Sequence, residues 1–300
     1  MHYPPLRPVL GLLFNAMVFG LCWWPLREMQ VRGLHPLWAT AFMYAFALVG
    51  ISWFNRAAWH SLWRHPALWW LFIASGLTNF GFNWAVTLGD VVRVVLLFYT
   101  MPAWSVLFAW WLLGERPTTQ SLLRLLLALA GVALVLKTPE MAWPWPSSHL
   151  DYLALLGGAS FALTNVMLRK LAHLPESERM SAMFGGGMVV TAVAAAAGGP
   201  LGLVNWPTDL SWWPYALGLA LCLLASNLSL QYGAARLPAG TTSLVMLSEI
   251  VFATLSSVAL GASELSQRQL IGGALIVLAA VLATMPTAAQ AAKETPHEHL

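Results

Sequence analysis

The sequence NFGFNWAVTLGDVVRVVLLFYTMPAWSVLFAWWLLGERPTTQSLLRLLLALAGVALV, residues 79–135, has a pattern of breaks that returns almost in register at residues 227–283. The breaks are LGD at 88–90 and LGE at 113–115 in the first copy, and RLPAG at 236–240 and LGASE at 260–264 in the second. Each copy predicts three apolar helices, and two further apolar runs precede each copy. The sequence therefore predicts two units of five helices. Because five is odd, the second unit enters the membrane from the opposite side, so the two repeats are inverted. Inverted repeats are typical of secondary transporters, with the substrate site near the midplane.

The composition is that of a polytopic membrane protein. Of 300 residues, 59% are hydrophobic and 9% charged, against about 45–50% and about 25% in a soluble domain. A span needs about 20 residues, and we predict ten of them, at 8–27, 34–54, 66–87, 91–113, 119–136, 150–170, 180–204, 212–234, 240–260 and 267–285. The predicted fold class is all-α, with ten transmembrane helices in two inverted five-helix repeats. Residues 1–138 form the first repeat, 139–149 a linker, 150–286 the second repeat, and 287–300 a disordered cytoplasmic tail.

The distribution of charge predicts the orientation. The formal charge of +3 reflects membrane topology here rather than a nucleic-acid partner. Lys and Arg are more frequent in the loops on the side of the N-terminus, which by the positive-inside rule places both termini in the cytoplasm. We expect a multi-pass protein of a bacterial inner membrane. The two cysteines, Cys22 and Cys222, lie in different repeats, so neither a disulfide framework nor a metal site is indicated, and no cofactor is expected.

Paired amides are the first candidate site residues. Asn79 and Asn83 lie one helical turn apart, and Asn227 and Gln231 have the same spacing in the second repeat. Residues at i and i+4 share one helix face, so both pairs are expected to point into one central space. Amides there could hold the polar end of a small zwitterion or sugar without placing a net charge in the membrane. The alternative is direct bonding between helices 3 and 8.

Two further amides and two aromatic residues complete the uncharged candidates. Asn15 lies in the middle of helix 1 and is either a cavity residue or a packing contact between helices. Asn165, a further candidate, lies in helix 6 one turn from Arg169. In helix 4, Pro102 removes a backbone hydrogen bond and predicts a kink. Tyr99 and Trp104 flank this kink and are expected to contact a substrate side chain, although packing explains Tyr99 nearly as well.

Two charged residues have distinct expected roles. Glu249 is the only acid near the middle of a predicted span, where a charge costs about 2.5–3.5 kcal/mol. It therefore couples to protons, binds a substrate amine, or is protonated and hydrogen-bonded to a neighbour such as Ser248 or to an adjacent helix. Arg93, at the outer start of helix 4, could bind a carboxylate, but a solvated residue at the helix end is the favoured interpretation.

The chain resembles the drug/metabolite transporter superfamily in its ten-helix form with two EamA-type repeats. The residues that carry the resemblance are Pro102 with LGE at 113–115, SEIVFA at 248–253, Leu260-Gly261 and Gly272. Ile250 stands where the family usually has Pro, and Ala262-Ser263 interrupts the final Gly-Glu. Residues 19–27 (FGLCWWPLR) and 33–37 (GLHPL) look like those of the YddG-type aromatic amino-acid exporters. This resemblance implies efflux of neutral amino acids through a central cavity lined by helices 1, 3, 4, 6, 8 and 9.

These observations favour an exporter of small neutral metabolites, foremost aromatic and other neutral amino acids, that works by alternating access. Its partners are the lipid bilayer and a small-molecule substrate, and the sequence leaves proton coupling open. An exchanger of the same superfamily with another substrate is the alternative. An integral-membrane enzyme is less favoured, because the sequence has neither an HExxH zinc motif nor a GxSxG elbow. A purely structural scaffold would not require the repeated amide pairs.

Overall fold

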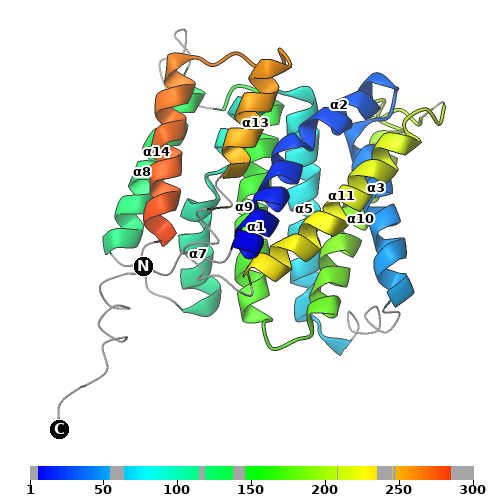
Figure 1. The fold of residues 1–300 in the computed structure, drawn as a ribbon, viewed down its shortest axis with the longest axis horizontal. Helices are drawn as coiled ribbons and strands as arrows, with labels where there is room; N and C mark the ends of the chain where they lie inside the picture. The colour runs from blue at the N-terminus through cyan, green and yellow to red at the C-terminus, as the bar shows by residue number, and fades with distance from the viewer. Residues whose placement is uncertain are drawn as a thin grey trace.

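The computed structural model describes residues 6–54, 64–114, 119–137, 146–207, 209–234, 245 and 248–284. Within these residues the regular elements are all α-helices (Figure 1). Their bounds are α1 Leu6–Leu21, α2 Trp23–Val31, α3 Pro36–Phe54, α5 Ala67–Leu88, α6 Val91–Phe98, α7 Met101–Leu113, α8 Thr119–Leu136, α9 His149–Lys170, α10 Glu176–Gly198, α11 Trp213–Ala234, α13 Ser248–Ala259 and α14 Gln267–Thr284. The predicted tail and most of the predicted linker lie outside the described residues.

Among the residues that the structure describes, two of the predicted spans are interrupted helices. The first is broken at Cys22, between α1 and α2, and the fourth at Tyr99 and Thr100, between α6 and α7. Pro102 lies in the first turn of α7, where a proline fits without loss of a helical hydrogen bond. The predicted kink is therefore a full break that lies just before the proline.

Helix α10 ends earlier than predicted. α10 ends at Gly198 instead of residue 204, because the chain folds back there: the backbone N–H groups of Leu203 and Val204 both donate to the Gly198 carbonyl, at 3.0 and 3.3 Å. Five of the described helical stretches are long and apolar enough to cross a membrane: Leu6–Val31, Val91–Leu113, His149–Lys170, Glu176–Gly198 and Trp213–Leu230.

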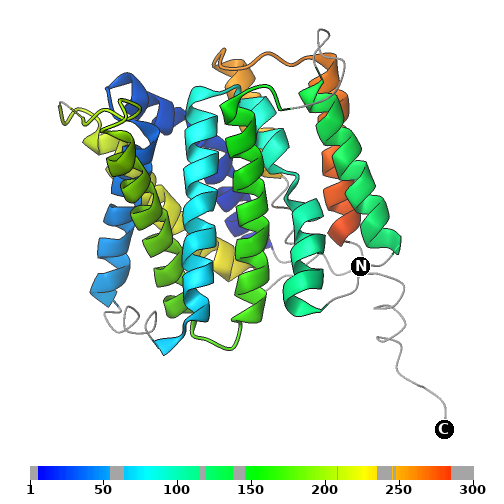
Figure 2. The ribbon, with the colours of Figure 1, turned by 180° about the vertical axis from the view of Figure 1, so that it is seen from behind.

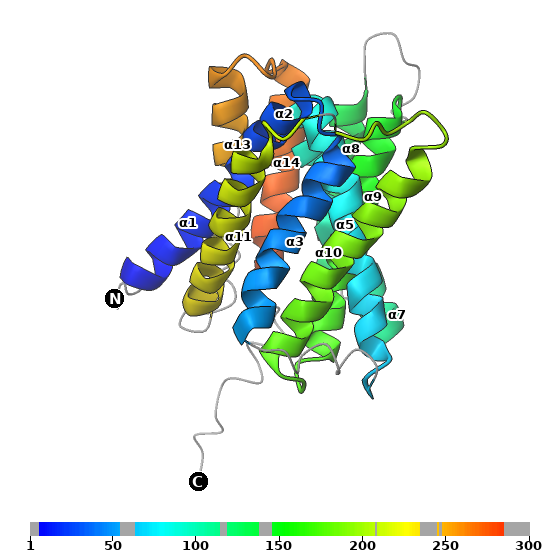
Figure 3. The ribbon, with the colours of Figure 1, turned by 90° about the vertical axis from the view of Figure 1, so that its right-hand side faces the viewer.

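The helix pairings follow a reciprocal pattern. α5 packs against α9 and α10, whereas α11 packs against α1 and α3, and α8 packs against α14 (Figures 2 and 3). Glycines allow the closest approaches. A Cβ atom at Gly81 of α5 would lie 2.9 Å from the Gly157 nitrogen of α9, and one at Gly131 of α8 would lie 2.7 Å from the Gly272 carbonyl oxygen of α14. Small residues at such positions let helix backbones meet in a membrane.

Candidate substrate site

Two predicted site residues, Tyr99 and Glu249, meet inside the bundle. The Tyr99 hydroxyl donates a hydrogen bond to Glu249 Oε2 at 3.0 Å. Tyr99 is 4% exposed and forms the C-cap of α6, and Glu249 lies in the first turn of α13. Ser248 instead donates to the Val245 carbonyl. Of the contacts expected for Glu249, the structure therefore contains the one to an adjacent helix.

The Tyr99–Glu249 pair lies at interrupted backbone. Tyr99 occupies the gap between α6 and α7, and the neighbouring Thr100 Oγ1 is buried without a hydrogen-bond partner among the described residues. On the other side, Gly20 of α1 lies against α13, because a Cβ atom there would be 2.8 Å from the Glu249 carbonyl oxygen. Gly20 precedes the α1–α2 break by two residues. Broken helices supply polar groups at membrane depth and commonly form the binding sites of transporters.

The first amide pair binds α3. Tyr44 donates to Asn79 Oδ1 at 2.6 Å, Asn79 Nδ2 donates to the Ser75 carbonyl at 2.8 Å, and Asn83 Nδ2 donates to Thr40 Oγ1 at 3.1 Å. The described partners of both amides thus lie on α3 and on their own helix α5, and not on α11. The sequence analysis missed Thr40 and Tyr44, although their i, i+4 spacing in an apolar run was a usable signal.

The remaining amides occupy separate positions. Asn15 is fully buried, and its Nδ2 donates to the Ser226 carbonyl at 3.1 Å and to Ser226 Oγ at 2.5 Å, which joins α1 to α11. Its Oδ1 has no described partner. Asn227 lies half-buried on α11 beside Ser226, and the Gln231 side chain is outside the described set. The shared central space of the four amides stays a prediction.

Asn165 and Trp104 lie on two helices that pack against each other. Asn165 is half-buried on α9, and Trp104 is half-buried on α7, which packs against α9. The Trp104 ring stacks on Phe108 with 6.3 Å between centroids. Neither side chain has a described contact with the Tyr99–Glu249 pair.

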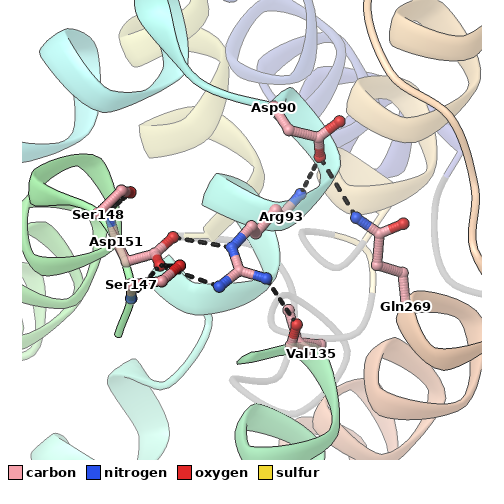
Figure 4. A network of polar contacts seen from close by, with 7 residues as sticks. All are labelled: Asp90, Arg93, Val135, Ser147, Ser148, Asp151 and Gln269. Atoms are coloured by element: carbon pink, nitrogen blue, oxygen red, sulfur yellow. Dashed lines mark hydrogen bonds and ion pairs between the residues drawn. The ribbon is translucent and has the colours of Figure 1, made fainter. Parts of the chain in front are cut away.

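The expectation that Arg93 is solvated is wrong. Its Nε and Nη2 donate to the two carboxylate oxygens of Asp151 at 2.8 and 2.9 Å, and its Nη1 donates to the Val135 carbonyl at 2.8 Å (Figure 4). Asp151 is 2% exposed. Because α6, α8 and α9 meet at this point, the guanidinium is drawn into the protein as the partner of a buried carboxylate.

Comparison with known proteins decides the family. The model of the EamA-like transporter family matches residues 6–137 and 150–285. This chain belongs to that family. Fourteen solved chains also match, and one of them, described only as a crystal structure of a protein, has a TM-score of 0.58 and 23% identity over 92% of this chain and 97% of the other. A search of curated proteins found no match.

The EamA-like family assignment gives the site its context. The chain is a multi-pass membrane transporter of the drug/metabolite superfamily. Tyr99 lies in the first matched segment and Glu249 in the second, and the Arg93–Asp151 ion pair also joins the two segments. Both polar contacts therefore lie where the two EamA segments pack together.

Proposed function

We propose that this EamA-like transporter exports small neutral metabolites, foremost aromatic and other neutral amino acids, by alternating access at a central site. The observation that carries the proposal is the Tyr99–Glu249 pair, a partly buried hydroxyl–carboxyl contact between the two matched segments at a break in a helix. In this proposal the architecture is ten helices in two inverted repeats, of the kind found in the YddG-type exporters. The reciprocal pairing of α5 with α9 and α10, and of α11 with α1 and α3, supports it.

The side chains around the pair support an amphipathic substrate. The Phe98 ring lies 4.6 Å from Phe82, 5.4 Å from Phe161 and 6.0 Å from Tyr99 between centroids. These rings form an aromatic cluster next to a carboxyl group, a combination suited to an apolar side chain with an amine attached. In the proposal Glu249 binds the substrate amine.

The carboxylate of the substrate needs uncharged donors nearby. We assign this role to the amides of Asn79 and Asn83, which now donate to Ser75 and Thr40. An amide that exchanges an internal hydrogen bond for one to the substrate loses little free energy, because a neutral hydrogen bond contributes only about 0.5–1.5 kcal/mol net. Binding through amides would also leave the site without a fixed positive charge.

Alternating access requires one end to be closed while the other is open. We call the end of the bundle that carries α2 and the α13–α14 loop the α2 end (Figure 3). There Trp23 Nε1 donates to Ser256 Oγ at 3.0 Å, and the Val91 and Val92 N–H groups donate to Ser263 Oγ at 3.0 and 3.4 Å. We propose that these contacts between the matched segments hold the α2 end closed, that this end faces the periplasm, and that both termini are cytoplasmic.

Counterflow in proteoliposomes tests the proposal. Vesicles loaded with unlabelled phenylalanine should take up labelled phenylalanine, tryptophan, methionine or threonine without a pH gradient. Glu249→Gln removes the ion pair to the amine and should lower uptake at least tenfold, whereas Tyr99→Phe removes one hydrogen bond and should weaken apparent affinity several-fold. Glu264→Gln, in the exposed α13–α14 loop, is the matched control and should leave uptake unchanged.

The outcomes separate the parts of the proposal. Wild-type uptake that appears only with an imposed proton gradient would make Glu249 a proton-coupling residue instead of an amine ligand. Uptake that is equal in wild type, Glu249→Gln and Tyr99→Phe would rule out the site. A wild-type protein that carries none of these amino acids would refute the substrate class and favour an exchanger of other metabolites.

A further inference from the structure

The segment between α10 and α11, residues 199–212, presents large apolar side chains outside any helix. Four of them are exposed by 63 to 72%: Leu201, Leu203, Trp206 and Leu210. Within this segment only residue 208 lies outside the described part of the chain. The segment passes along the α2 end of the bundle, level with the helix ends (Figures 1 and 3). An exposed apolar surface of this kind marks a contact site.

The segment is held in a defined structure. Val204 is buried in a cluster at the start of α3, and the Trp206 ring packs edge-on against Trp38 with 4.7 Å between centroids. The Trp212 ring stacks on Phe42 at 4.8 Å, with an angle of 14° between the planes. These contacts fix the backbone from the inside. The exposed side chains are therefore presented outward by a packed scaffold.

The charges of the segment identify the partner. Residues 199–212 contain no Lys or Arg, and Asp209 is their only acid. The Ser211 N–H and hydroxyl donate to Asp209 Oδ1 at 2.9 and 2.8 Å, and these hydrogen bonds lower the pKa of Asp209. Its carboxyl is therefore ionised at neutral pH and stays hydrated. A surface with apolar residues, a tryptophan and one hydrated carboxylate matches the membrane–water interface.

We propose that residues 199–212 insert into the headgroup–acyl boundary of the leaflet at the α2 end, with Leu201, Leu203, Trp206 and Leu210 in contact with lipid and Asp209 in water. The depth is that of an interfacial segment, about 5–10 Å into this boundary. Because the segment has no basic residues, its insertion does not require anionic lipid. The inserted segment anchors α10 and α11 and, through Trp38 and Phe42, the start of α3.

An environment-sensitive probe tests the proposal in the full chain. In a Cys22→Ala, Cys222→Ala background, Leu203→Cys is labelled with a nitrobenzoxadiazole fluorophore and the protein is reconstituted into phosphatidylcholine vesicles. Glu264→Cys is the matched control, because it is an exposed loop position at the same end. Leu210→Cys is a second probe. Leu203 and Leu210 are 63% and 70% exposed, so both substitutions leave most of the internal packing intact.

If the segment is inserted, fluorophores at Leu203→Cys and Leu210→Cys should emit at shorter wavelength than the fluorophore at Glu264→Cys. Iodide should quench these two probes several-fold more weakly than it quenches the control. Lipids with a nitroxide near the headgroup should quench these probes more strongly than lipids with a nitroxide at the chain end. The signals should be equal with and without phosphatidylglycerol. Emission and iodide quenching equal to those of the control would overturn the proposal. So would a signal that depends on the protein-to-lipid ratio, because that result would assign the surface to a second copy of the chain.

Discussion

Replacing Asp151 by Asn tests the buried ion pair that joins the two matched segments. The Asp151 carboxylate accepts two hydrogen bonds from Arg93 and one from the Ser147 N–H at 3.0 Å, and the two side chains are 3% and 19% exposed. Removing one partner of a buried pair leaves the other charge uncompensated, which typically costs about 3–5 kcal/mol. Arg93 keeps its hydrogen bond to the Val135 carbonyl and some contact with water. We therefore expect Asp151→Asn to lower the free energy of unfolding by about 3 kcal/mol, near the lower end of this range.

The assay is the free energy of unfolding in mixed micelles, measured for Asp151→Asn, Arg93→Met and the double variant. Because the double variant has neither charge, its free energy of unfolding should lie within about 1.5 kcal/mol of the wild-type value. The double-mutant cycle should therefore give a large coupling energy between Asp151 and Arg93. Glu28→Gln is the control, since the Glu28–Arg32 pair is about 30% exposed on both sides and its loss should cost only about 0.2–1 kcal/mol. Equal losses for Asp151→Asn and Glu28→Gln would refute the reasoning.

Three further predictions concern stability. Gly131→Ala should lower the unfolding midpoint, because its Cβ atom would lie 2.7 Å from the Gly272 carbonyl oxygen. In the control Gly218→Ala, the new Cβ atom meets nothing within 4 Å, so this variant should be neutral or stabilising by up to about 1 kcal/mol. A lower midpoint for both variants would contradict the packing of α8 against α14. Burial lowers the pKa of His35, whose Nδ1 accepts a hydrogen bond from the Leu37 N–H. The unfolded chain therefore binds a proton at this imidazole more readily than the folded protein does. The free energy of unfolding should fall as the pH drops below about 6.5. Unfolding midpoints across this pH range should show the fall in wild type and a weaker one in His35→Asn. Ser263→Ala removes the hydroxyl that accepts hydrogen bonds from two N–H groups at the start of α6. This change should lower the free energy of unfolding by about 1 kcal/mol in the same assay. An unchanged unfolding midpoint would show that these two hydrogen bonds do not stabilise the fold.

The sequence predicted helix positions well where the signal is local. The helix expected at residues 119–136 is α8, Thr119–Leu136, and the one expected at 150–170 is α9, His149–Lys170. The sequence contains no local signal for the break between α1 and α2 at Cys22, because the apolar run continues through this residue. Pro102 gave the signal for the other break but not its place, since a proline fits the first turn of a new helix as well as a kink.

The sequence predicted which residues belong to the candidate site, but not which of them contact each other. Glu249 and Tyr99 were both selected from the sequence, and the structure adds that they bind each other. Arg93 was assigned to water because a helix-end arginine is usually hydrated. Its actual partner, Asp151, lies at the start of a helix in the other matched segment, and spacing along the chain carries no information about such a contact.

The sequence by itself determined the membrane class, the helical runs and most of their ends, because the transfer of each side chain into hydrocarbon and the chemistry of each turn are local properties. Only the tertiary structure decided which buried polar group binds which. That choice depends on which helices lie side by side, and close approaches between distant residues such as Gly81 and Gly157 fix those neighbours. Once α3 lies against α5, the Asn79 amide must bond to whatever α3 offers, and α3 offers Tyr44.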